Sequence, residues 1–202
     1  KTDYIKKSVD AGLNVLADKP MAIDENGFNL LKQAFESAKS NNVLLYDIMT
    51  ERYEITNTLQ RELAQVTEIF GTLEKGTPEN PSVVKESVHH FFKYISGEPI
   101  VRPTWFFDVN QQGEGMVDVT THLVDLVQWS CFPDVTLDYA KDVQITSAKR
   151  SATTVTKEQF KMVTKKEEFP DFLQKDVKGN ALQVYANGEL NYTLKDVHAK
   201  VA

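Results

Sequence analysis

The chain has 202 residues, of which 41% are hydrophobic, so its length and composition suit a globular protein with a core and exclude a disordered chain. A formal net charge of −6 and the lack of a dense Lys/Arg cluster argue against nucleic acid or an anionic membrane as a partner. The single cysteine, Cys131, excludes an internal disulfide, and no apolar run approaches the ~18 residues of a membrane span. Without a recognisable signal peptide, these features favour a cytoplasmic protein, although a cleaved signal would leave no trace.

Residues 1–48 alternate helix signals with short apolar strands. Ile5 and Val9 predict a helix that stops at Gly12, a residue suited to the left-handed backbone of a helix end. Strands are predicted at 14–17 and 43–46. Short apolar strands that follow helices are typical of a parallel sheet with covering helices, so residues 1–48 are predicted to be the last stretch of such a sheet.

Two further helices are predicted from apolar spacing. The first follows a cap at Asp24 and stops at Asn41. Its predicted buried face consists of Phe28, Leu31, Phe35 and Ala38. The second covers residues 51–70, and its apolar side consists of Ile55, Leu59, Leu63, Val66 and Phe70.

Strand signals dominate after a predicted loop at 71–81. Runs at 82–95 and 100–109 are rich in β-branched and aromatic residues, and Gly97-Glu98-Pro99 between them predicts a hairpin. Ser130 to Val135 reads as a turn before a strand at 136–147. Thr156 and Gln159 predict the capping box of a short helix. Asn187-Gly188, between alternating runs at 181–185 and 189–194, predicts a second hairpin.

The stretch Gly113–Trp129 combines an apolar face with a polar stripe. A buried helical face is predicted from Met116, Val119, Leu123 and Leu126. The adjacent stripe consists of Asp118, His122, Asp125 and Trp129. His122 is the best proton carrier of the chain, and either carboxylate could hold its ring. The stripe predicts a pocket wall, although an acid and a histidine four residues apart also occur as a solvated surface pair.

Lys19 is the second candidate for chemistry. It follows a predicted parallel strand, and open α/β sheets bind ligands at the carboxyl ends of their strands. Pro20 biases Lys19 toward an extended conformation, and Asp18 could hold its ammonium group. There Lys19 could stabilise negative charge on a substrate oxygen. The alternative is an exposed lysine in solvent.

The remaining candidates are weaker. His89, His90 and His198 are interpreted as structural or surface residues, and Cys131 as a small buried residue. Trp105, Phe106 and Phe107 could shape a sugar pocket, but a packed sheet accounts for them better. Asp118, His122 and Asp125 could share a metal ion, but three ligands from one helix are unusual, so no metal is predicted.

Two segments carry a resemblance to a known family. Residues 11–22, which include Asp18-Lys19-Pro20, resemble the Glu-Lys-Pro segment of the Gfo/Idh/MocA family, the relatives of glucose-fructose oxidoreductase and inositol dehydrogenase. Residues 113–125 resemble its second motif, a glycine-rich turn followed by Asp118 and, four residues later, His122. The C-terminal part is similar to a subgroup described as putative oxidoreductases. Asp18 differs from the usual Glu, and Thr120 stands where many members have Gly.

The resemblance implies the fold class α/β and α+β. Residues 1–48 would be the tail of a dinucleotide-binding Rossmann domain. Residues 49–202 would be a substrate-binding domain with a mixed, mainly antiparallel open sheet and flanking helices, through which the protein forms homo-oligomers. No Gly-x-Gly-x-x-Gly turn occurs in the chain, so most of the Rossmann domain is expected to be missing and the chain alone to bind the cofactor poorly.

The predicted function is an NAD(P)-dependent oxidoreductase that acts on a sugar, cyclitol or related polyol. The resemblance implies that Lys19, Asp118 and His122 are catalytic, that Lys19 and Pro20 contact the NAD or NADP cofactor, and that Trp105 joins the catalytic residues in binding substrate. Two alternatives remain at this stage: a non-catalytic sugar- or cofactor-sensing protein, and a glycosidase that uses transient oxidation. The sequence leaves the substrate, the choice between NAD and NADP, and the oligomer open.

Overall fold

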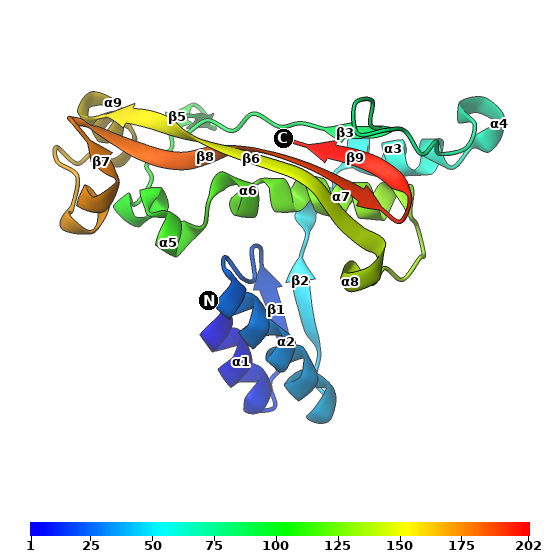
Figure 1. Ribbon diagram of the computed structural model, residues 1–202. Coiled ribbons are helices and arrows are strands. Elements are labelled where there is room, and N and C mark those ends of the chain that lie inside the picture. Colours follow the sequence, from blue (N-terminus) through cyan, green and yellow to red (C-terminus); the bar gives the residue numbers. More distant parts are fainter. The chain divides into compact units, whose positions relative to one another are not determined.

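The computed structural model describes all of residues 1–202, which divide into two compact units. Unit 1 comprises residues 1–74 and 121–137, and unit 2 comprises residues 75–120 and 138–202. Figure 1 labels most of the helices and strands along the chain. The domain boundary predicted between residues 48 and 49 concerns the fold of a larger protein and stays a prediction. No helix combines the length and apolar character that crossing a membrane requires.

Unit 1 begins with the predicted alternation of helix and strand. Its elements are α1 (Thr2–Asp10), β1 (Val15–Asp18), α2 (Glu25–Ser40), β2 (Leu45–Ile48), the 3-10 helix η1 (Thr50–Tyr53), α3 (Ile55–Ala64), α4 (Thr67–Phe70) and nearly all of α7 (Thr120–Cys131). β1 and β2 pair in parallel, as predicted. Gly12 has the positive φ of 76° expected after α1, and the Asp24 carboxylate caps α2 by accepting a hydrogen bond from the Gly27 amide at 2.6 Å.

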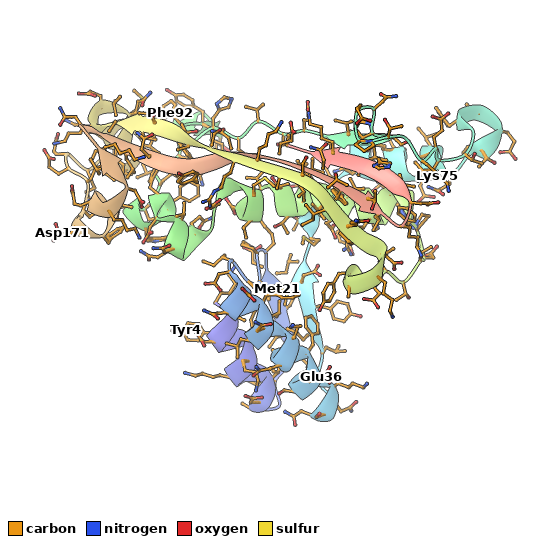
Figure 2. All side chains as sticks on the ribbon, in the orientation of Figure 1. Tyr4, Met21, Glu36, Lys75, Phe92 and Asp171 are labelled. Atoms are coloured by element: carbon orange, nitrogen blue, oxygen red, sulfur yellow. The ribbon has the colours of Figure 1, made fainter.

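A small aliphatic core holds α1 and α2 against β1 and β2. It consists of Ile5, Val9, Ala17, Ala34, Ala38 and Leu45. Met21, labelled in Figure 2, packs against this core from the loop after β1. The buried face predicted for α2 was partly wrong: Phe28 and Phe35 are exposed, because the helix faces the core through the smaller Ala34 and Ala38.

The opposite face of the β1–β2 pair is uncovered. Leu16 and Tyr46 are cross-strand neighbours on this face, and they are 68% and 63% exposed. Their neighbours Ala17 and Leu45 point to the other face and are buried. The pair is therefore packed on one face only, which is unusual for parallel strands.

The single helix predicted over residues 51–70 was wrong. η1, α3 and α4 are separate elements, and none of them contains a buried residue. The Glu54 carboxylate starts α3 by accepting hydrogen bonds from the amides of Thr56 and Asn57 at 2.9 and 3.1 Å. A side-chain cap inside the predicted helix thus replaces it with a new helix start.

Unit 2 is built on a five-stranded sheet. Its elements are β3 (Val83–Lys85), β4 (Tyr94–Ile95), β5 (Glu98–Pro99), η2 (Thr104–Phe107), α5 (Val109–Gln112), α6 (Gly115–Asp118), α8 (Tyr139–Asp142), β6 (Val143–Thr156), α9 (Lys157–Thr164), η3 (Asp171–Asp176), β7 (Val177–Lys178), β8 (Ala181–Leu194) and β9 (Val197–Val201). The strand order is β3-β9-β8-β6, with β7 also paired to β8. Only the β3–β9 pair is parallel, which confirms the mixed, mainly antiparallel open sheet.

The hairpin predicted at Asn187-Gly188 was wrong, because both residues lie inside the continuous strand β8. β6 is equally long and pairs with β8 across this point, so the two long strands run side by side in Figure 1. The pairing register shifts between Ser151 and Thr153, and the Asn187 amide donates to the Thr153 hydroxyl at 2.9 Å. Asn-Gly therefore accompanies a bulge here rather than a chain reversal.

The strands predicted at 82–95 and 100–109 are mostly absent. Only β3 and the two-residue strands β4 and β5, joined at Ser96-Gly97, form there. The aromatic residues instead pack edge to face in a core centred on Phe107, Phe160 and Phe169, with ring centroids 4.9 to 5.3 Å apart.

The strand predicted at 136–147 is confirmed over residues 143–147, which begin β6, and was wrong over residues 139–142, which form α8. The capping box of Thr156 and Gln159 is confirmed at the start of α9.

Candidate functional site

The glycine-rich turn of unit 2 is explained by a close approach of α6 to β8. A side chain at Gly115 would overlap the backbone carbonyl of Ala186, and one at Gly188 would overlap the side chain of Met116. Gly113, just before α6, has a positive φ of 89°. The turn therefore needs one glycine for its backbone conformation and another for contact with the sheet.

The predicted helix over residues 113–129 is interrupted at Val119. α6 ends at Asp118, and α7 begins at Thr120. Asp118 is half-buried, and its negative charge acts on the guanidinium of Arg102 within unit 2. His122, also half-buried, lies in the first turn of α7 and belongs to unit 1. Val119, Leu123 and Met116 are only half-buried, and the fully buried residues of α7 include Leu126 and Val127.

Asp125, one turn after His122, is paired with Arg52. Its side chain is only 10% exposed, and both of its oxygens accept hydrogen bonds from the guanidinium, with the Nε bond at 2.7 Å. The hydrogen bond that Arg52 donates to Asp125 is the main cause that raises the pKa of Arg52, against the effect of burial. Of the two carboxylates considered for orienting His122, Asp125 thus already has a strong partner from η1.

Trp129, the last residue of the predicted stripe, also anchors α7. The Arg61 guanidinium stacks 4.9 Å from its ring centroid and donates to its carbonyl oxygen at 3.3 Å. The Gln65 amide donates to the next carbonyl, that of Ser130, at 3.1 Å. Two members of the stripe, Asp125 and Trp129, therefore hold α7 in unit 1 through their contacts with Arg52 and Arg61.

Lys19 immediately follows β1, at the carboxyl end of the parallel pair, as predicted. The Lys1 ammonium donates to the carbonyl oxygens of Asp18, Lys19 and Pro20 at 3.0, 3.2 and 3.1 Å and so fixes this loop. The Lys19–Pro20 peptide bond is cis. Unit 1 therefore contains both Lys19 and His122, whereas Asp118 belongs to unit 2.

The other predicted candidates are dispersed. Trp105 lies in η2 and is 46% exposed, whereas its neighbour Phe107 is in the aromatic core. His89 and His90 are exposed in an irregular segment, and His198 is half-buried in β9. Cys131 is only partly buried at the end of α7. No group of three His, Cys, Asp or Glu side chains is arranged to hold a metal ion.

Sequence reasoning missed two arginines. Arg52 lies 73 residues from its partner Asp125, so no local pattern could reveal the pair. Arg102 stacks on Phe106, with the guanidinium carbon 4.3 Å from the ring centroid. A basic residue next to an aromatic run was its only sequence signal.

Comparisons with known proteins agree with this fold. A family model described as putative oxidoreductase C-terminal domain matches residues 59–202. The crystal structure of a putative oxidoreductase from Parabacteroides merdae has 56% identity and a TM-score of 0.97, and the match covers 100% of this chain and 46% of that one. No curated protein sequence matches the chain.

Two more distant solved structures share the fold. The first is GenD2 from gentamicin A biosynthesis in complex with NAD, with 17% identity, a TM-score of 0.55, and coverage of 100% of this chain and 44% of that one. The second is the WlbA dehydrogenase from Bordetella pertussis in complex with NADH and UDP-GlcNAcA, with 14% identity, a TM-score of 0.53, and coverage of 99% and 44%. The chain thus spans less than half the length of each of these three relatives.

Proposed function

Because the chain belongs to the family of putative oxidoreductase C-terminal domains, within the Gfo/Idh/MocA oxidoreductases, we propose that the whole protein is an NAD(P)-dependent oxidoreductase of a sugar, cyclitol or related polyol. The observation that carries the proposal is Lys19 at the carboxyl end of a parallel strand, in the same compact unit as His122. The NAD in the GenD2 structure, and the NADH and UDP-GlcNAcA in the WlbA structure, support this choice of cofactor and substrate class.

The residues present fit the nicotinamide end of such a cofactor. Lys19 and Pro20 directly follow β1, at the carboxyl end of the strand, where open α/β sheets bind ligands. The uncovered face with Leu16 and Tyr46 supports a larger parallel sheet in the whole protein, since parallel sheets are normally covered on both faces. The phosphate-binding Gly-x-Gly-x-x-Gly turn is not among residues 1–202, so we assign no phosphate contacts.

Lys19 and His122 have complementary roles in this proposal. A bound nicotinamide supplies the hydride acceptor or donor. The Lys19 ammonium donates a hydrogen bond to the substrate hydroxyl oxygen and stabilises negative charge that develops there. The His122 imidazole takes the hydroxyl proton during oxidation and returns it during reduction.

Asp118 and Trp105 are proposed to bind substrate. A carboxylate accepts hydrogen bonds from sugar hydroxyl groups, and Asp118 is half-buried at the end of α6. An exposed indole such as that of Trp105 can cover an apolar face of a sugar. The catalytic role predicted for Asp118 remains part of the proposal.

The Arg52–Asp125 pair is proposed to position His122. Arg52 lies in η1, which follows β2, and β2 ends beside β1. Its two hydrogen bonds to Asp125 hold α7 one turn after His122. The pair thus connects α7, the helix that contains His122, to η1, the segment that follows β2.

We further propose that the open sheet of unit 2 forms the interface of a homo-oligomer. β6 lies at the edge of the sheet, and most of its residues are exposed, including Ile145. An exposed edge strand has unpaired backbone groups that can pair with another chain. Light scattering should give an oligomer for the protein, and replacement of Ile145 by Lys should shift it toward the monomer.

The test is hydride transfer by the whole protein. We expect NADH or NADPH formation, followed at 340 nm, with at least one sugar, sugar acid or cyclitol from a broad panel. Binding of sugar and cofactor without turnover would instead indicate a sensing protein. Glycoside cleavage that requires the cofactor without net reduction would indicate a redox-cycling glycosidase.

A second test concerns residues 1–202 alone. Calorimetric titration with NAD and with NADP should give weak or no binding, because the chain contains no phosphate-binding turn. Micromolar affinity would contradict the assignment of residues 1–48 as only part of a cofactor domain.

A further inference from the structure

One of the four arginines of the chain, Arg102, differs from the others in its hydrogen bonding. Three have hydrogen-bond acceptors: Arg52 has Asp125, Arg61 has the Trp129 carbonyl and Glu62, and Arg150 has Glu114. Arg102 has none for its side chain, and its Nε is buried without a partner. A buried N–H group without an acceptor is costly, so the Nε of Arg102 calls for an explanation.

Arg102 is held in place from two sides. Its backbone amide donates to the carbonyl oxygen of Val163, in α9, at 3.0 Å. Its guanidinium stacks on the ring of Phe106, which itself packs against the aromatic core. The side chain therefore has little freedom to move away to a distant acceptor.

The remaining donors of Arg102 are available to a ligand. Nε is enclosed, but the two Nη nitrogens keep access to solvent and make no hydrogen bond to the protein. Asp118 acts on Arg102 through its negative charge. The two Nη groups can thus meet an anion with parallel hydrogen bonds.

We propose that Arg102 is a specificity-determining residue that binds the carboxylate of an acidic sugar, such as a uronic or aldonic acid. The proposal rests on the proposed function, because it names the substrate class of the same enzyme. Asp118, the nearby candidate for binding a sugar hydroxyl, supplies the polar neighbour such a substrate needs.

The local charge favours a carboxylate over a phosphate. Arg102 contributes one positive charge, and the carboxylate of Asp118 nearby opposes a second negative charge on the ligand. A planar monoanion matches the guanidinium in charge and in geometry. A phosphate dianion would need further cations beside it.

The experiment measures sugar binding by calorimetry to the whole protein without cofactor, and then turnover with NAD or NADP. The probes are glucuronate, galacturonate, gluconate, glucose and glucose 6-phosphate. Arg102→Gln removes the positive charge. Arg102→Lys keeps the charge but loses the two parallel hydrogen-bond donors of the guanidinium. Arg150→Gln is the matched control, because Arg150 also stacks on an aromatic ring, 4.7 Å from the centroid of Tyr185, but is paired with Glu114.

We expect at least one sugar acid to bind more tightly than glucose. Arg102→Gln should weaken that binding by about 10- to 100-fold, the effect of a charged hydrogen bond, whereas glucose binding should change little. Arg102→Lys should retain part of the preference, and Arg150→Gln should retain all of it. Unchanged thermal unfolding of Arg102→Lys would exclude misfolding as the cause of its partial loss.

Three outcomes would overturn the inference: equal binding of acids and glucose, preference for glucose 6-phosphate, or an acid preference that survives Arg102→Gln. Failure of the proposed function gives a different result, namely no reduction of NAD or NADP by any probe. Because the binding measurement needs no turnover, the two failures are distinguishable.

Discussion

Unit 1 and unit 2 bury their side chains in different ways. Unit 2 has a five-stranded sheet and an aromatic core that includes Phe107, Phe160 and Phe169. Unit 1 has a small core of aliphatic residues, with one uncovered face on β1 and β2 and no buried residue in α3. The candidate proton carrier and Lys19 nevertheless belong to unit 1. The larger core therefore lies in unit 2, whereas Lys19 and His122 belong to unit 1.

The largest expected difference in stability is between core and surface phenylalanines. Phe160→Ala in unit 2 should destabilise the protein by about 3–5 kcal/mol, because it removes a fully buried ring. Phe35→Ala in unit 1, where the ring is exposed, should change stability by less than about 1 kcal/mol. Chemical denaturation of both variants measures the difference, and equal effects would contradict the contrast between the cores.

The next test concerns the glycine-rich turn. Gly115→Ala should cost about 1–3 kcal/mol or more, since its methyl group would overlap the Ala186 carbonyl in β8. Gly188→Ala should cost less, because it meets the flexible Met116 side chain. Thermal unfolding of the two variants ranks them, and the reverse order would refute the explanation of the motif.

A smaller effect is expected for the ion pair of unit 1. Arg52→Gln should cost about 1–3 kcal/mol, because it leaves the mostly buried Asp125 without its bidentate partner and Arg52 itself is partly exposed. The exposed pair Lys75–Asp196 of unit 2 is the control, and Lys75→Gln should cost less than Arg52→Gln, because solvent screens an exposed ion pair. Urea denaturation curves of both variants test this order.

The smallest expected effect is the pH dependence contributed by Asp108 in unit 2. Burial opposes ionisation, but hydrogen bonds from Gln111 and Lys175 outweigh it and lower the pKa of this carboxyl. A lowered folded-state pKa gives stability that is present above the usual value of about 4 and is lost as pH falls through the folded-state value. Asp108→Asn should flatten the decline of the urea midpoint below about pH 4.

Local chemistry made part of the fold predictable. Gly12 correctly predicted the end of α1, and Asp24 correctly predicted the start of α2. Thr156 and Gln159 form the predicted capping box of α9. These signals succeeded because each acts within a few positions along the chain. The hairpin predicted from Asn187-Gly188 was wrong, because the pairing of β8 with the long strand β6 outweighed the local turn preference.

The site was predictable where sequence order and spatial role coincide. Lys19 follows its strand directly, so its place at the strand end could be inferred. The pairing of Asp125 with Arg52 could not, because it joins residues 73 positions apart. For Arg102 the position beside an aromatic run was not enough, because its distinguishing feature, a buried Nε without an acceptor, exists only in the folded chain.

The central claim is that His122 carries the proton during hydride transfer. The most direct measurement is kcat of the whole protein and of His122→Ala with its best substrate, with His90→Ala as an exposed control. The account predicts a loss of about 10²- to 10⁴-fold for His122→Ala, with little change in thermal unfolding and none in the control. A kcat within a few-fold of the parent protein would contradict it.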